Sequence, residues 1–82
     1  MEPTVTLYGK PGCCLCDEAK EAIQAARLDR DFELHEVDVS LDPALHSRYG
    51  ERIPVVEIDG EEAFELHLDA ASLRERLDTV AS

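Results

Sequence analysis

Three cysteines crowd into four residues of this chain, and they constrain what the chain can become. Cys13, Cys14 and Cys16 lie in a turn-like segment rich in glycine and proline. A strand-like run, residues 4–8, precedes this segment, and a helix-like run, residues 15–27, follows it. Cysteines this close together cannot staple distant parts of a fold, so we expect chemistry rather than a disulfide framework. A Cys-x-x-Cys pair at a strand-to-helix junction predicts a dithiol–disulfide centre.

The position of the pair gives the physical reason. Backbone N–H groups in the first turn of a helix have no intrahelical partners, and the helix dipole adds partial positive charge there. A thiolate at that point is stabilised, so its pKa falls. We expect Cys13, the earlier of the pair, to be more exposed and more acidic than Cys16. The carboxylates of Asp17 and Glu18 oppose thiolate formation, so the expected lowering of the Cys13 pKa is moderate.

Cys14 leaves several interpretations open. It is an inert small hydrophobe, a spare thiol or an alternative disulfide partner. Adjacent cysteines pair only with strained geometry, which favours Cys13 with Cys16 over Cys13 with Cys14. Leu15 lies off the apolar stripe of the helix that follows, so we expect it to be exposed beside the reactive sulfur. We expect Tyr8, on the strand before the cysteines, to pack in the core rather than to contact substrate.

Hydrophobic periodicity predicts the order of elements β-α-β-α-β-β-α. The expected ranges are 4–8, 15–27, 32–39, 43–49, 55–58, 61–66 and a last helix after residue 69 with Leu73, Leu77 and Val80 on its apolar side. A strand–helix–strand start implies a parallel pair, and the later hairpin adds antiparallel strands. The sequence therefore predicts an α/β fold, a four-stranded mixed sheet with three helices placed on both faces. Gly9 is expected only to interrupt the pattern of the first strand.

Short-range signals predict several boundaries. Asp42-Pro43 is typical of an N-cap followed by proline at the first helical position, and Asp69 is typical of a second N-cap. Asp59-Gly60 predicts a two-residue type I′ turn. We also expect Gly50 to end the short helix in a left-handed conformation and either a bulge or a change of face to occur near Glu36.

Length, composition and net charge limit the partners and locations that we expect for this chain. The chain has 82 residues and a net charge of −11, from 19 acidic residues against 8 Lys and Arg. This length predicts a single domain, residues 1–82. A surface this acidic repels phosphate backbones and anionic membranes, so we expect neither nucleic acid nor a membrane as partner. The N-terminus has no secretory signal pattern and no apolar run could span a membrane, so we expect a cytoplasmic location.

The motifs taken together resemble the glutaredoxin branch of the thioredoxin fold, and especially the small bacterial glutaredoxin-like proteins. The similarity covers nearly the whole chain and rests on Leu7-Tyr8-Gly9-Lys10-Pro11-Gly12-Cys13-Cys14-Leu15-Cys16-Asp17 and Arg52-Ile53-Pro54-Val55. The resemblance implies a thioredoxin-like fold and thiol–disulfide oxidoreductase activity.

The resemblance also implies a role for each matched position. Cys13 matches the attacking nucleophile of the family, and Cys16 matches its resolving thiol. Pro54 matches a cis-proline that packs beside the disulfide, and the backbone of Ile53 would pair with a bound peptide or glutathione. Lys10 matches a lysine that meets a glutathione carboxylate.

Two segments depart from the usual glutaredoxin pattern. Typical members have a Gly-Gly pair and an acidic residue before the last helix, where this chain has Glu65-Leu66-His67-Leu68-Asp69. Cys14 and Leu15 stand between the active cysteines in place of Pro-Tyr, and we expect both to contact substrate. From the resemblance we expect no bound cofactor, glutathione as co-substrate, and a monomer that acts on protein disulfides or glutathione mixed disulfides.

Two alternatives stay open on the sequence alone. Cys-x-x-Cys is half of a zinc site, and the resemblance also allows an iron–sulfur cluster shared between two chains. A closed zinc site needs two further ligands, whereas His35, His46 and His67 stand singly in separate elements, so we expect no metal. The other alternative is a redox-inactive binding module that has kept the fold.

Overall fold

The computed structural model describes residues 3–81, without the side chains of residues 80 and 81. Its elements are β1 (Thr4–Gly9), α1 (Cys14–Arg27), β2 (Glu33–Asp38), the 3₁₀ helix η1 (Val39–Leu41), α2 (Pro43–Tyr49), β3 (Val55–Ile58), β4 (Glu61–Glu65) and α3 (Ala70–Ala81). The predicted mixed four-stranded sheet with three helices in the order β-α-β-α-β-β-α is therefore confirmed.

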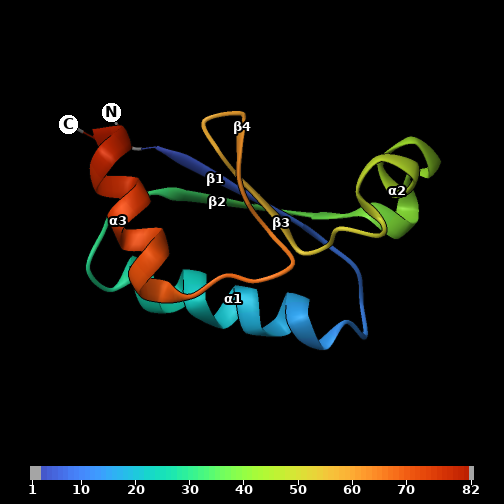
Figure 1. The fold of residues 1–82 in the computed structure, drawn as a ribbon, viewed down its shortest axis with the longest axis horizontal. Coiled ribbons are helices and arrows are strands. Elements are labelled where there is room, and N and C mark those ends of the chain that lie inside the picture. Colours follow the sequence, from blue (N-terminus) through green and yellow to red (C-terminus); the bar gives the residue numbers. More distant parts are fainter. Residues whose placement is uncertain (1–2, 82) are drawn as a thin grey trace.

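The sheet has the strand order β2-β1-β3-β4 (Figure 1). β1 is parallel to β2 and antiparallel to β3, and β3 is antiparallel to β4. A parallel pair needs a long crossover, which α1 supplies, because a tight turn can join only antiparallel strands. β1 and β2 consequently finish at the same end of the sheet, and α1 begins near that end.

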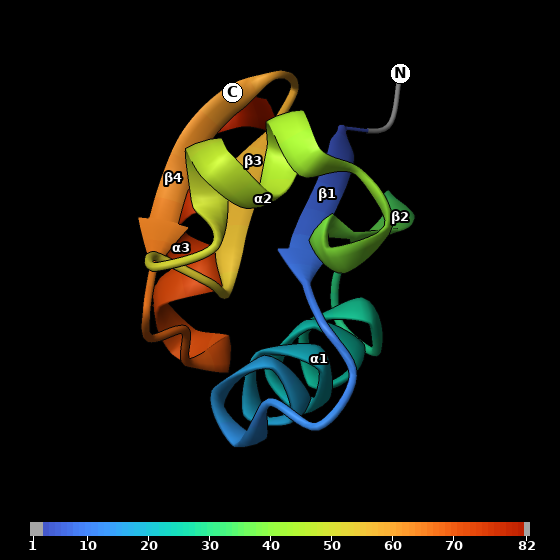
Figure 2. The same ribbon diagram turned by 90° about the vertical axis from the view of Figure 1, so that its right-hand side faces the viewer.

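α1 and α3 cover one face of the sheet, and α2 lies at the end where β1 and β2 finish (Figures 1 and 2). Alternation in the strands and spacings of three and four in the helices each place apolar side chains on one face. The main core between the sheet and the two helices contains Val5, Leu7, Ala19, Ile23, Ala26, Phe32, Val56, Ile58, Leu73 and Leu77. A second buried cluster beside α2 contains Cys16, Val39, Tyr49, Ile53 and Val55.

The capping and turn predictions are confirmed. Asp42 Oδ1 accepts an N–H from the first turn of α2 at 2.9 Å, and Asp69 Oδ1 accepts one from the first turn of α3 at 2.8 Å. Asp59 and Gly60 have φ angles of 52° and 86°. Positive φ at both central residues is what a type I′ turn requires.

Two predictions about the second strand are wrong. Glu36 is not bulged, because it pairs with Leu7 within an unbroken register of β1 and β2. The register shift of the sheet lies instead between Val56 and Glu57, where β3 pairs with β4. Val39 belongs to η1 rather than to the second strand.

Gly50 also differs from its prediction, since its φ of −54° is right-handed. A side chain at Gly50 would collide with the carbonyl oxygen of His46, so glycine is needed for space and not for handedness. The predicted burial of the Val80 side chain lies outside the described residues. Within residues 3–81, no helix is long and apolar enough to cross a membrane.

The core assignment leads to a stability prediction. Leu73 of α3 is 0% exposed, so Leu73→Ala should lower the free energy of unfolding by about 2–5 kcal/mol. Leu28 is 87% exposed, so Leu28→Ala should change it by less than about 0.5 kcal/mol. Urea denaturation followed by circular dichroism measures both variants, and equal losses would contradict the placement of α3 in the core.

Candidate active site

Cys13 occupies the N-cap of α1, one residue before the cap position that the predicted start at residue 15 implies. Its backbone is extended, with φ −92° and ψ 113°. Its Sγ accepts the backbone N–H of Cys16 at 3.3 Å, and its carbonyl accepts the N–H of Asp17 at 3.1 Å. The sulfur therefore replaces the usual capping oxygen and satisfies an N–H that the helix leaves unpaired. A thiolate gains more from this contact than a neutral thiol does.

The two sulfurs lie within interaction distance of each other but in different surroundings. Cys13 is half-buried, whereas Cys16 is only 7% exposed, and neither is disulfide-bonded. The pKa of Cys13 is lowered, first by a hydrogen bond from the Cys16 thiol and then by the N–H groups of Cys16 and Leu15 and the charge of Lys10, although burial opposes them. Burial, together with the hydrogen bond to Cys13, raises the pKa of Cys16 to about 11. The pair thus divides into one acidic thiol and one thiol that stays protonated.

Gly9 is part of this site, although its sequence context indicated only the end of a strand. A Cβ built on Gly9 would lie 2.9 Å from Cys16 Sγ and 3.2 Å from Cys16 Cβ. The next backbone N–H, that of Lys10, also interacts with the Cys16 sulfur and works against the rise in its pKa. The end of β1 therefore runs directly alongside the buried thiol. Sequence reasoning had no signal for this contact, because many glycines end strands.

A cis peptide bond joins Ile53 to Pro54, and both residues are buried. Ile53 belongs to the same apolar cluster as Cys16, and Cys13 packs against that cluster. Within residues 3–81, the backbone N–H and carbonyl groups of Ile53 have no hydrogen-bond partner. The structure thus places Ile53 in the buried cluster of Cys16 and leaves its backbone hydrogen-bonding groups unused.

Leu66 hydrogen-bonds to the loop that contains Pro54. Its N–H donates to the carbonyl of Pro54 at 2.9 Å and to that of Arg52 at 3.2 Å. Its φ is 68°, in the left-handed region that leucine rarely adopts, and its side chain is 43% exposed. Leu66 lies in the segment where typical glutaredoxins have their glycine pair. The absence of that pair is the one sequence signal that pointed to this residue.

Two tyrosines and a carboxylate support the same end of the sheet, and the sequence did not link them. The rings of Tyr8 and Tyr49 stack with centroids 4.5 Å apart, which joins β1 to α2. Both hydroxyls donate to Glu57 of β3, at 2.8 Å from Tyr8 and 3.3 Å from Tyr49. Burial and the Glu57 carboxylate raise the pKa of Tyr8 to about 12. Tyr8 thus links β1 to α2 and β3, and the expectation that it does not contact substrate stays a prediction.

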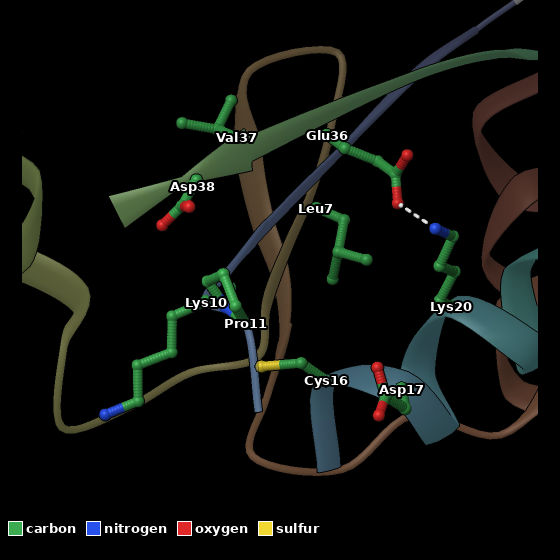
Figure 3. Close-up of a pocket in the computed structure, with 10 residues that line it drawn as sticks. Leu7, Lys10, Pro11, Cys16, Asp17, Lys20, Glu36, Val37 and Asp38 are labelled. Carbon is green, nitrogen blue, oxygen red and sulfur yellow. Dashed lines mark ion pairs between the residues drawn. The ribbon is translucent and has the colours of Figure 1, made fainter. Parts of the chain in front are cut away.

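A cavity of about 320 Å³ opens beside the buried thiol (Figure 3). Its walls are Leu7, Gly9, Lys10, Pro11, Cys16, Asp17, Lys20, Glu36, Val37 and Asp38. Lys20 and Glu36 form an ion pair of 3.2 Å across it, and the Cys16 sulfur is turned toward Lys10 and Pro11. The cavity gives water a path to a sulfur that is otherwise enclosed.

The remaining predicted site residues are placed less uniformly. Cys14 and Lys10 are exposed, and Leu15 is half-buried rather than exposed as expected.

Within the described part of the chain, no three His, Cys, Asp or Glu side chains converge closely enough to hold a metal ion. A zinc or cluster site on the two cysteines would therefore need ligands from outside residues 3–81.

Residues 4–78 match the glutaredoxin-like domain family, DUF836. The chain belongs to this family. A relative, an uncharacterized protein of Mycobacterium tuberculosis, is 30% identical over 77 residues, which cover 88% of this chain and 79% of the relative.

Solved structures agree with this family and with the predicted fold. A crystal structure of an X. campestris protein shares 39% identity with this glutaredoxin-like domain at a TM-score of 0.78, covering 92% of this chain and 96% of that one. A thioredoxin variant from Halobacterium salinarum is 21% identical, with a TM-score of 0.74, and the match covers 99% of this chain and 76% of that one. The second likeness shows the fold alone, and that fold is thioredoxin-like.

The unequal cysteines lead to a pH prediction. In a Cys14→Ser background, iodoacetamide should modify Cys13 first at any pH below about 8, because nucleophilic thiolate forms at lower pH on the thiol with the lowered pKa. Modification of Cys16 should accelerate only as the pH rises toward about 11. Peptide mass mapping measures both rates, and faster modification of Cys16 would reverse the assigned roles.

Lys10 leads to a second electrostatic prediction. Its ammonium charge helps to lower the pKa of Cys13, so Lys10→Gln should move that pKa upward, and added salt should reduce the difference from the unmodified chain. Lys20→Gln is the matched control, because the Lys20 charge is paired with Glu36. Thiolate absorbance against pH measures the pKa in both variants. Equal shifts would mean that general surface charge, and not Lys10, acts on the thiol.

Proposed function

We propose that this glutaredoxin-like domain is a thiol–disulfide oxidoreductase that exchanges electrons through Cys13 and Cys16. The observation that carries the proposal is that the two thiols differ in exposure and in pKa. Cys13 is accessible at the N-terminus of α1 with a lowered pKa, whereas Cys16 is buried with a pKa of about 11. Perturbed ionisation of this kind concentrates at reactive sites, which favours a reactive pair over an inert packing pair.

In the first step the Cys13 thiolate attacks one sulfur of a substrate disulfide. A bond forms between Cys13 Sγ and that sulfur, the substrate disulfide bond breaks, and the other substrate sulfur leaves as a thiolate. The N–H of Cys16, 3.3 Å from Cys13 Sγ, stabilises the negative charge on the attacking sulfur. Lys10 adds a favourable charge outside the helix.

In the second step Cys16 loses its proton to water and attacks Cys13 Sγ. The Cys13–Cys16 disulfide forms, the mixed disulfide breaks, and the second substrate sulfur leaves as a thiolate. The substrate has then gained two electrons and the protein has lost two. An external thiol, glutathione or a protein dithiol, must reduce the protein again.

The substrate would lie along the cis-proline loop. The free backbone groups of Ile53 can pair with an extended peptide, and the Ile53 side chain lies in the same buried cluster as Cys16. Cys14 and Leu15, at the start of α1, would contact the substrate on the other side of Cys13. Protein disulfides and glutathione mixed disulfides are the substrate classes that suit such a surface. We place the domain in the cytoplasm as a monomer.

A trapping experiment in glutathione redox buffers tests the function. The unmodified chain should pass from dithiol to intramolecular disulfide as the buffer becomes oxidising. Cys16→Ser should instead accumulate one glutathione on Cys13, because the second step is blocked, and Cys13→Ser should form neither product. Intact mass and tryptic mapping distinguish these species.

A peptide disulfide serves as a second substrate in the same experiment. Trapping on Cys16→Ser with the peptide but not with glutathione would assign the domain to protein substrates. Failure to trap either one, with no intramolecular disulfide in the unmodified chain, would contradict the proposed function.

A further inference from the structure

Gly9 is the last residue of β1, and it lies directly against the buried thiol. It pairs with Asp38 of β2 in the parallel ladder, so its backbone is fixed by the sheet. A Cβ on Gly9 would come within 2.9 Å of Cys16 Sγ, a distance that real Cβ atoms essentially never show. The contact does not depend on backbone handedness, because Gly9 is absent from the glycines with positive φ. Glycine is needed here for space alone.

The sulfur of Cys16 is confined on several sides. The end of β1 borders it on one side, and Cys13 interacts with it on another. It belongs to the apolar cluster with Ile53 and Val55, and the cavity beside Lys10 is the open side. Any atom added on the β1 side must therefore push the sulfur away from its present position, because strand and helix backbones cannot move apart easily.

We propose that Gly9 is a positioning residue for the resolving step. Because glycine has no side chain, Cys16 Sγ can occupy the position from which it attacks a mixed disulfide on Cys13. This inference rests on the proposed function. It assigns Gly9 mainly to the second step, since Cys13 lies outside the contact and the position of the Cys16 thiol affects the first step only through its hydrogen bond to Cys13.

Gly9→Ala should slow the resolving step by a larger factor than the first step, which it affects only by weakening the hydrogen bond from the Cys16 thiol that lowers the pKa of Cys13. Relief of the contact requires the sulfur to move by several tenths of an ångström, and misplacement on the order of 1 Å costs up to about a hundredfold in rate. We expect resolution to be at least about tenfold slower.

The aromatic disulfide 5,5′-dithiobis(2-nitrobenzoate) separates the two steps in a Cys14→Ser background. Cys13 thiolate attacks it and releases one thionitrobenzoate anion. Cys16 thiolate then attacks Cys13 Sγ, forms the intramolecular disulfide and releases the second anion. The unmodified background should release two thionitrobenzoate anions per protein, and Gly9→Ala should slow the release of the second by a larger factor than the release of the first.

Gly60→Ala is the matched control for general destabilisation. Gly60 lies in the turn after β3 at the opposite end of the sheet, and its φ of 86° makes alanine strained there without a contact to either cysteine. Gly60→Ala should lower the melting temperature and leave both phases unchanged. An unchanged second phase in Gly9→Ala, or equal slowing in Gly60→Ala, would overturn the inference. Release of only one thionitrobenzoate anion per protein in the unmodified background would instead contradict the proposed function.

A stability cycle keeps the inference testable if Gly9→Ala does not fold. Cys16→Ala removes the sulfur that the new Cβ would strike, so the double variant Gly9→Ala/Cys16→Ala should melt close to Cys16→Ala alone. If Gly9→Ala lowers the melting temperature equally in both backgrounds, residue 9 does not act through the sulfur and the inference fails.

Discussion

The contact between Cys13 Sγ and the N–H of Cys16 is the interaction on which the rest of the site depends. It makes the first cysteine the cap of α1, so the reactive sulfur sits where unpaired backbone donors converge. The same contact fixes the separation of the two residues at one turn, which carries Cys16 inward to the sheet. One cap therefore creates both an accessible acidic thiol and an enclosed neutral one.

The sheet determines what surrounds the pair. β1 and β2 end together because they are parallel, and this end also receives the cis-proline loop before β3 and the start of α1. The stacked rings of Tyr8 and Tyr49, both bonded to Glu57, hold α2 to this end. The buried thiol, which itself belongs to α1, is consequently enclosed by the end of β1, by α2 and by the cis-proline loop. These segments are separated from one another in the sequence and meet only in the folded chain.

The excess of acidic residues is partly offset by specific pairing. Arg30 bonds Asp78 at 2.7 Å, and Arg74 approaches Asp29 at 2.8 Å, so two cations tie α3 to the end of α1. Arg52 contacts Glu62 and Glu65 at 3.1 and 3.0 Å beside the Pro54 loop. Its charge is therefore already engaged, and Lys10 is the cation that influences Cys13.

The sequence by itself determined the features that depend on near neighbours. The caps at Asp42 and Asp69, the turn at Asp59-Gly60 and the one-turn spacing of the cysteines follow from residues a few positions apart, and so does the order of elements. The tertiary structure alone decided the closeness of Gly9 to Cys16, the unbroken pairing of Glu36 with Leu7 and the left-handed Leu66. Each of these features depends on the register between strands or on a loop that hydrogen-bonds to a carbonyl far away in the sequence. No local pattern of residues encodes contacts between such distant segments.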